Sequence, residues 1–177
     1  DYTATSVVLT RVTAPAFTSA NSATFYTGGN FSFAVTASGF PAPPFAVTAG
    51  TLPAGVTLNS NGTLSGTATE TGTFTFTITA SNGVNPNATQ SFTLTVLAGV
   101  APTITSTNAA TFVFGEGGTF AVTATGTPTA VLSVAGLPAG VTFDPATGVL
   151  DVGTTAAAGV YALTVTAANG VTPSATQ

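Results

Sequence analysis

Apolar and polar residues alternate one by one along several short segments of the chain. Phe31, Phe33 and Val35 alternate with small or polar residues, and residues 73–79 alternate Thr with Phe and Ile. A period of two is typical of a β-strand with one face in a core and the other in water. Segments rich in Gly, Pro and Asn separate these runs, as turns do. The pattern therefore predicts an antiparallel β-sandwich of short strands and no helix.

The sequence repeats itself once. Residues 15–90 align with residues 102–177, starting from an offset of 87 residues. Five blocks recur in the same order: Ala-Thr-Phe at 23–25 and 110–112, Phe-Ala-Val-Thr-Ala at 33–37 and 120–124, Leu-Pro-Ala-Gly-Val at 52–56 and 137–141, Asn-Gly-Val at 82–84 and 169–171, and Ala-Thr-Gln at 88–90 and 175–177. Chance does not produce five ordered matches, so two copies of one domain are expected.

The order of these blocks, together with Asn-Gly-Thr-Leu at residues 61–64, resembles the Ig-like repeats of prokaryotic cell-surface and extracellular proteins, which have a cadherin-like sandwich. The resemblance covers nearly the whole chain in two copies, and the second copy departs from it at residues 147–153. It implies an all-β fold of two tandem Ig-like antiparallel β-sandwiches. It also implies an extracellular or cell-surface location and a structural or adhesive role rather than a reaction.

The two copies differ at their ends. In the first, Gln90 is followed by an alternating run at residues 91–96, which we expect to be the last strand of that sandwich, whereas the second copy stops at Gln177. Residues 4–10 precede Pro15 as residues 91–97 precede Pro102. We therefore expect three parts: an N-terminal strand at 1–14, a first repeat at 15–100 and a second repeat at 101–177 that lacks its own final strand.

Two explanations of this arrangement stay open. The chain is one window of a longer tandem array, or residues 1–12 of one copy complete the second sandwich of the next copy. Strand donation of the second kind runs head to tail and builds an open filament. The alignment puts Val7 in the place of Leu94 and Leu9 in the place of Val96. The expected interface residues are Thr5, Val7, Val8 and Leu9.

Composition removes most other functions. Charged residues make up 3% of the chain, with one cation, Arg11, five acidic residues, and no His or Cys. No cofactor and no Cys or His metal site is expected. Asp144 and Asp151 fit a hairpin turn better than a catalytic pair, so no catalytic residue is assigned. Five scattered carboxylates do not make a calcium site. One cation cannot neutralise a phosphate backbone, so nucleic-acid binding is not expected. No window is apolar enough for a membrane span.

The alternative function is an adhesive module that binds a glycan or a host surface. Hydroxyls recur along one strand face from Thr71 to Thr79, although a solvated face with little charge has the same pattern. The first copy also has aromatic residues without an aromatic counterpart in the second, Tyr26, Phe40 and Phe45. Two explanations stay open for them: an exposed contact between subunits or domains, or a better-filled first core. Asn30, Asn61 and Asn87 each begin an N-glycosylation triplet at an expected turn. A glycan is therefore a possible partner or a covalent modification.

Overall fold

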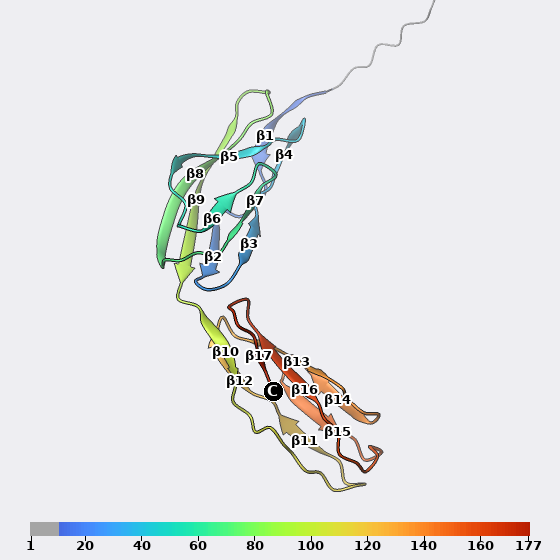
Figure 1. The fold of residues 1–177 in the computed structure, drawn as a ribbon. Coiled ribbons are helices and arrows are strands. Elements are labelled where there is room, and N and C mark those ends of the chain that lie inside the picture. The colour runs from blue at the N-terminus through green and yellow to red at the C-terminus, as the bar shows by residue number, and fades with distance from the viewer. Residues whose placement is uncertain (1–10) are drawn as a thin grey trace, which may run out of the picture. The chain divides into compact units, whose positions relative to one another are not determined.

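The computed structural model describes residues 11–177, and these residues form β-strands and no helix (Figure 1). The strands pair in antiparallel ladders. The all-β class that the alternation predicts is therefore confirmed. No segment within 11–177 forms a helix with the length and apolarity that a membrane crossing requires. Thr5, Val7, Val8 and Leu9 lie outside the described residues, so their predicted role stays a prediction.

The first repeat contains three sheets. Their strand orders are β2-β9-β8-β5, β3-β7-β6 and the pair β1-β4. The strands are β1 (Thr13–Phe17), β2 (Ser22–Tyr26), β3 (Phe31–Ala34), β4 (Ala37–Phe40), β5 (Phe45–Gly50), β6 (Val56–Leu58), β7 (Thr63–Gly66), β8 (Gly72–Ala80) and β9 (Ala88–Leu97). The longest ladder joins β8 to β9, from Gly72 opposite Val96 to Ala80 opposite Ala88. The predicted final strand, residues 91–96, lies within β9.

The second repeat follows the same plan with one strand fewer. Its sheets have the orders β13-β16-β17, β11-β15-β14 and β10-β12. The strands are β10 (Val100–Ile104), β11 (Gly118–Ala121), β12 (Ala124–Thr127), β13 (Val131–Ala135), β14 (Val141–Asp144), β15 (Val149–Val152), β16 (Thr164–Ala168) and β17 (Ala175–Thr176). By alignment, β16 corresponds to β8 and β17 to the start of β9. Residues 109–113, which align with β2, are not in a strand.

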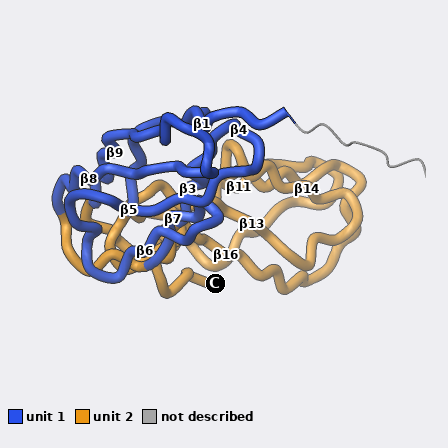
Figure 2. The backbone as a smooth tube through the Cα atoms, turned by 90° about the horizontal axis from the view of Figure 1, so that it is seen from above, with its two compact units in different colours: residues 1–25, 32–66, 72–96 blue, residues 26–31, 67–71, 97–177 orange. Residues whose placement is uncertain are grey.

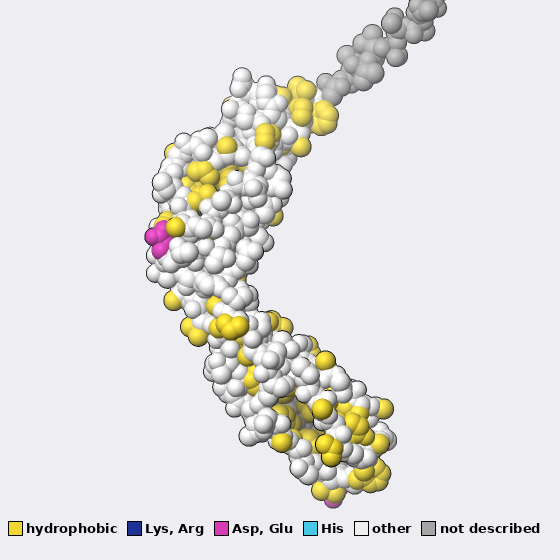
Figure 3. All heavy atoms as spheres, in the orientation of Figure 1, with side chains coloured by type: hydrophobic (Ala, Val, Ile, Leu, Met, Phe, Trp, Pro, Cys, Tyr) yellow, Lys and Arg dark blue, Asp and Glu magenta, His cyan; other side chains and the backbone are white. Residues whose placement is uncertain are grey.

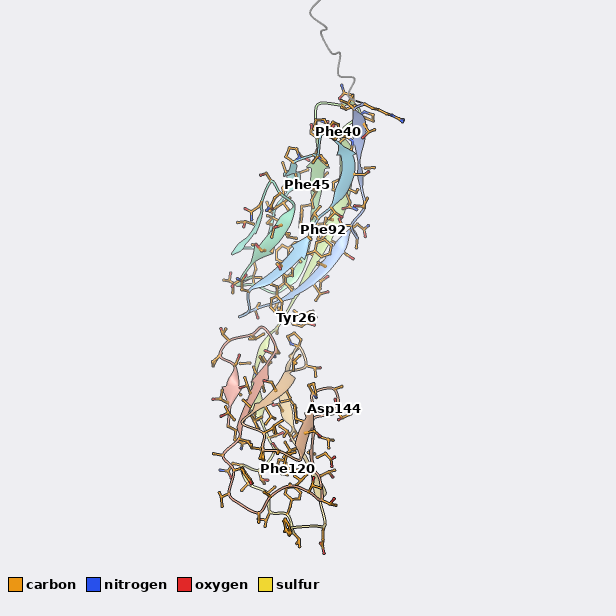
Figure 4. All side chains as sticks on the ribbon, turned by 90° about the vertical axis from the view of Figure 1, so that its right-hand side faces the viewer. Tyr26, Phe40, Phe45, Phe92, Phe120 and Asp144 are labelled. Atoms are coloured by element: carbon orange, nitrogen blue, oxygen red, sulfur yellow. The ribbon has the colours of Figure 1, made fainter. Side chains whose placement is uncertain are left out.

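The core of the first repeat is built from the inward face of the strands. Phe76, Phe92, Ile78 and Leu94 have at most 2% of their surface exposed. The ring centroid of Phe92 lies 5.3 Å from that of Phe33 and 5.4 Å from that of Phe76. Figure 4 shows Phe92 inside this sandwich. Burial of this size drives folding, because each fully buried large apolar side chain contributes about 1.5–3 kcal/mol.

The chain divides into two compact units (Figure 2). Unit 1 holds the described residues up to Phe25 together with Ser32–Gly66 and Gly72–Val96. Unit 2 holds Leu97–Gln177 and two short segments, Tyr26–Phe31 and Thr67–Thr71. The boundaries predicted for the repeats, 15–100 and 101–177, stay predictions.

Candidate functional site

One asparagine in each repeat joins three separate segments of backbone. The Asn82 Nδ2 donates to the carbonyls of Thr13, at 2.9 Å, and Pro41, at 2.7 Å, while its Oδ1 accepts from the Val84 amide at 3.1 Å. The Asn169 side chain makes the same three bonds, to Val100, Pro128 and Val171, at 2.9, 2.7 and 3.0 Å. We call this arrangement the Asn clamp. It ties the first strand, a proline turn and the Asn-Gly-Val loop together.

A glycine makes room for each Asn clamp. A Cβ atom added to Gly39 would lie 3.1 Å from the Asn82 Nδ2, and one added to Gly126 would lie 2.9 Å from the Asn169 Nδ2. Both glycines also have positive φ, +138° and +151°, which side-chain-bearing residues rarely adopt. The sequence indicated these Asn-Gly blocks only as turns. Their recurrence in both copies was the signal of a further role, which is structural.

The second repeat has an open groove at the place that β9 occupies in the first. In the first repeat β9 lies between β2 and β8. In the second, the ladder at this place contains β17 and Gln177, whose backbone exchanges two hydrogen bonds with Val165, at 2.9 and 3.0 Å. Residues 109–113 and 159–163, which align with β2 and with the first half of β8, are not in strands. A segment forms a strand only where its backbone hydrogen-bonds to a neighbouring strand. Neither of these two segments has strand structure beside the groove.

The groove is apolar. Its volume is about 830 Å³, and it is lined mainly by side chains of the second repeat's core, including Phe112, Phe120, Val122, Val134, Leu163 and Val165. Around it, Val113, Phe114 and Val160 have 63%, 70% and 102% of their surface exposed. Figure 3 shows apolar side chains gathered on the surface of this repeat. Large apolar side chains exposed together in this way mark an interaction surface more often than a free one.

Aligned core side chains of the two repeats differ in burial beside the groove. Phe25 and Phe76 of the first repeat are 1% and 2% exposed, while their counterparts Phe112 and Leu163 are only half-buried. Away from the groove the repeats agree, since Ala80 and Ala167 are both fully buried. Phe112 and Leu163, which border the groove, are therefore less buried than their counterparts in the first repeat.

The lining of the groove is uncharged and mostly apolar. Its lining residues, among those described, include no Asp, Glu, Lys or Arg. What it offers is apolar burial and the backbone groups of two segments without strand partners. Those are the elements by which a sheet accepts an additional strand: main-chain hydrogen bonds supply affinity, and alternate side chains fill the pockets. The prediction that the second sandwich lacks its own final strand stays a prediction.

The two carboxylates considered for catalysis are parts of a hairpin. The Asp144 Oδ2 accepts from the Thr147 hydroxyl at 2.7 Å, and its Oδ1 accepts from the Ala146 amide at 2.9 Å. These bonds, the Thr147 hydroxyl first, lower the pKa of Asp144 below its ordinary value of 3.8. Asp151 lies within β15, opposite Thr142 and Thr119. Residues 11–177 contain no cluster of three or more His, Cys, Asp or Glu that could hold a metal ion.

The three glycosylation triplets lie on the surface. Asn30, Asn61 and Asn87 are all exposed, and all lie outside the strands. The Asn61 Oδ1 accepts from the Thr63 amide at 2.9 Å, and the Asn87 Oδ1 accepts from the Ser81 hydroxyl at 2.8 Å. These positions are reachable, and glycan attachment stays a prediction that mass spectrometry of native material tests.

The aromatic residues particular to the first repeat do not form one surface. Phe45 is 9% exposed and packs on Phe17, with ring centroids 6.0 Å apart, so it belongs to the core. Tyr26 is half-buried and packs on Phe31 at 5.6 Å. Phe40 is 51% exposed. Figure 4 shows Tyr26 and Phe40 at different places on this repeat. An exposed contact made by all three is therefore not formed.

The Thr-rich face is a two-strand ladder. Thr73, Thr75 and Thr79 stand opposite Thr95, Thr93 and Thr89, and Thr77 stands opposite Ser91. Thr73 and Thr75 are exposed, while Thr77 and Thr79 are half-buried. Cross-strand hydroxyl pairs stabilise a sheet modestly. These hydroxyl side chains therefore form the outer face of the β8–β9 pair.

Comparison with known proteins identifies the fold of each repeat. A family model described as "Putative Ig domain" matches residues 14–97 and matches again at residues 99–177. A comparison with curated proteins gave no match. The two matches together cover nearly the whole chain.

Two solved structures match more than nine-tenths of the chain. A chimeric titin Z1Z2 carrying an exogenous decorin peptide is 22% identical, with a TM-score of 0.51, and the match covers 94% of this chain and 95% of that one. Sidekick-1 immunoglobulin domains 1–5 are 18% identical over 93% of this chain and 38% of theirs, with a TM-score of 0.41. At these identities the likeness concerns the fold alone.

A further match is to part of an enzyme. A protein described as a "putative alpha-galactosidase" from Bacteroides fragilis NCTC 9343 is 25% identical, with a TM-score of 0.42, over 50% of this chain. The present chain spans about a fifth of that protein's length, since the match covers 19% of it. The likeness is thus limited to a minor part of the enzyme.

Proposed function

The chain belongs to the Ig family whose model matches both of its repeats, and from this premise we propose that it is a non-enzymatic structural subunit or spacer of an extracellular prokaryotic surface fibre. Its copies associate head to tail, and residues 1–12 of one copy enter the groove of the second repeat of the next. The observation that carries the proposal is the apolar groove of about 830 Å³ in place of a central strand.

The donor segment fits the groove by its sequence pattern. Val7 and Leu9 align with Leu94 and Val96, which are 0% and 1% exposed in the first repeat. An inserted strand would bury these two side chains and give residues 109–113 and 159–163 a strand to pair with. Both gains favour association, because paired backbone in a buried sheet avoids the cost of unsatisfied amide and carbonyl groups.

The low charge of the chain supports the same function. Sheet edges are normally kept apart by Lys and other charged side chains, whereas only 3% of this chain is charged. A surface with so few charges repels further copies only weakly, since the net charge is −4 over 177 residues. The non-enzymatic character rests on the groove's lack of charged lining residues and on the hairpin role of Asp144.

Light scattering and electron microscopy of the 177-residue chain test the proposal. Wild type should form filaments, and a double substitution, Val7→Asp with Leu9→Asp, should leave a monomer, because a charge in an apolar groove costs several kcal/mol. A second double substitution, Ser6→Asp with Thr10→Asp, is the matched control. In an extended strand these two positions alternate with Val7 and Leu9 and project to the other side, so this variant should assemble normally.

A mixing experiment separates donation from general loss of solubility or folding. The double variant keeps an intact groove, so it should accept a strand and donate none. Added at a small molar fraction to wild type, it should end growing filaments and shorten them, while the Ser6→Asp, Thr10→Asp variant should not. A wild-type chain that stays monomeric at all concentrations tested would falsify the proposal.

A further inference from the structure

We propose that Asn82 and Asn169 are latent sites of deamidation, the loss of ammonia from a side-chain amide. The folded repeat protects these amides through the Asn clamp, and a repeat that opens exposes its own amide to reaction. Once modified, that repeat cannot rebuild the clamp. The hydrogen bonds of the two clamps carry this assignment, and it holds whether or not the groove accepts a strand.

The chemistry follows from the glycine that succeeds each asparagine. The chain contains three Asn-Gly pairs, Asn61-Gly62, Asn82-Gly83 and Asn169-Gly170. The glycine backbone nitrogen attacks the asparagine Cγ: a new C–N bond forms, the bond from Cγ to Nδ2 breaks, and ammonia leaves with the proton of the glycine amide. Water then opens the cyclic imide and leaves aspartate or isoaspartate. Glycine hinders the attack least, because it has no Cβ, and no reactant other than water is consumed.

The clamp holds the amide that has to leave. The Asn82 Nδ2 donates to the carbonyls of Thr13 and Pro41, and its Oδ1 accepts from the Val84 amide. Asn169 makes the equivalent three bonds. Attack turns the planar Cγ tetrahedral and swings the side-chain amide out of its plane, so these bonds must break first. Deamidation therefore waits until the clamp opens.

Asn61 offers the same reaction under a looser hold. It is exposed, whereas both clamp asparagines are half-buried. Its Oδ1 accepts from the Thr63 amide, and the Gly62 amide donates to the Asn59 carbonyl, both at 2.9 Å. These bonds lie within one hairpin turn, while the carbonyl partners of Asn82 are 41 and 69 residues away from it. Opening one turn disturbs few other contacts, whereas opening the clamp separates three segments of the repeat.

A modified clamp cannot form again. Deamidation replaces Nδ2 by an oxygen, which at neutral pH belongs to a carboxylate and donates no hydrogen bond. At Asn82 this oxygen would face the carbonyls of Thr13 and Pro41, which lie 2.9 and 2.7 Å from the Nδ2. Acceptors at these distances repel one another, and both carbonyls lose their donor. Isoaspartate also lengthens the main chain of the loop. An opening that lasts long enough to react is therefore recorded covalently.

Rates of deamidation in the full chain test the protection. The chain is kept in mildly alkaline buffer with and without urea, and peptide mapping by mass spectrometry follows the three Asn-Gly pairs. In urea the pairs should react at similar rates. In buffer, Asn82 and Asn169 should be slowed at least about tenfold more than Asn61, because opening a clamp costs more than opening a turn. Clamp asparagines slowed no more than Asn61 would show that the clamp gives no protection, and the proposal would be wrong.

The glycines beside the clamps supply a matched pair of variants. A Cβ added at Gly39 would lie 3.1 Å from the Asn82 Nδ2, and one added at Gly126 would lie 2.9 Å from the Asn169 Nδ2. In buffer, Gly39→Ala should speed deamidation at Asn82 about tenfold or more and leave Asn169 unchanged, and Gly126→Ala should do the reverse. Each variant keeps every Asn-Gly pair, so each is the control for the other. If neither speeds its own clamp asparagine, opening does not limit the reaction and the proposal fails.

Substitution by aspartate tests the consequence of the reaction. Asn82→Asp installs the product, and Asn82→Ala removes the bonds without adding a charge. Hydrogen exchange of first-repeat peptides across a urea series should give a lower unfolding midpoint for Asn82→Asp than for Asn82→Ala. Asn61→Asp is the control and should keep a midpoint near that of wild type, since its carboxylate still accepts from the Thr63 amide. If Asn82→Asp unfolds at the midpoint of Asn82→Ala or a higher one, the claim that a modified clamp cannot form again is wrong.

Discussion

The two repeats share their sequence blocks, their strand order and the Asn clamp, but they bury their cores to different extents. In the first repeat, β9 supplies Phe92, Leu94 and Val96, each at most 1% exposed. In the second, the aligned place is a groove, and the half-buried Phe112 and Leu163 border it. The difference is centred on one strand position and extends to the two segments beside it.

What the difference teaches is that a central strand contributes more than its own side chains. β8 of the first repeat has nine residues, whereas its counterpart β16 has five, and β2 has no counterpart strand at all. A strand beside an empty position loses one set of ladder hydrogen bonds and one wall of its side-chain packing. Filling the groove should therefore extend two neighbouring segments as well as completing the core.

The largest expected effect is a difference in stability cost between two equivalent substitutions, one in each repeat. Phe25→Ala should destabilise the first repeat by about 3–5 kcal/mol, because it opens a cavity in a closed core. Phe112→Ala should cost the second repeat clearly less, about 1–2 kcal/mol, because its ring is already partly in water. Hydrogen exchange of peptides from each repeat, read by mass spectrometry in the Val7→Asp, Leu9→Asp background, gives the two values separately.

Adding the donor peptide sharpens this measurement. With residues 1–12 bound, the cost of Phe112→Ala should rise toward that of Phe25→Ala, because the ring then lies in a closed core. Equal costs without any peptide would mean that the second core is closed in the free chain, contrary to the difference drawn between the repeats.

A smaller effect should be the same in both repeats. Asn82→Ala and Asn169→Ala each remove three side-chain hydrogen bonds to backbone, and each should cost about 1–3 kcal/mol. The exposed Asn85 and Asn108 serve as controls, and alanine there should change stability by less than about 0.5 kcal/mol. Hydrogen exchange of the same peptides checks this. A loss at one clamp only would show that the repeats differ beyond the groove.

The alternation of apolar and polar residues was sufficient to predict strands that have a neighbouring strand on both sides. Residues 73–79 and 91–96, expected as strands, lie within β8 and β9. It failed where a strand depends on a neighbour far away in sequence. Apolar residues continue to alternate through Tyr161 and Leu163, yet β16 begins only at Thr164, because residues 159–163 have no partner strand. Alternation records which face a residue prefers and not whether a ladder is available.

The parts of the site that sequence reasoning missed are joined over long distances. The carbonyl partners of Asn82 lie 41 and 69 residues before it, and so do those of Asn169. No local pattern indicates such bonds, although the exact recurrence of Asn-Gly-Val pointed to a shared role. Phe40 and Phe45 flank one Pro-rich segment without alternation, so nothing local separated the exposed ring from the buried one.

The smallest expected effect concerns a turn at which the two copies use different residues. Asp144 caps the β14–β15 turn, where the aligned residue of the first repeat is Asn59. The bonds to Asp144 lower its pKa in the folded state. The ionised carboxylate therefore stabilises the second repeat at pH values above 3.8, the ordinary pKa of this group. That contribution should be lost as pH falls through the lower folded pKa.

The expected result is therefore a difference in slope between variants. From neutral pH down to below 3.8, the second repeat of wild type should lose more stability than that of Asp144→Asn, which keeps an acceptor for the Ala146 amide but does not titrate. Asp151→Asn, on the neighbouring strand, controls for the removal of one charge. Urea unfolding across this pH range measures the slopes. Parallel curves for wild type and Asp144→Asn would mean that the turn bonds do not depend on the charge of Asp144, and that the two copies' turns are energetically equivalent despite their different residues.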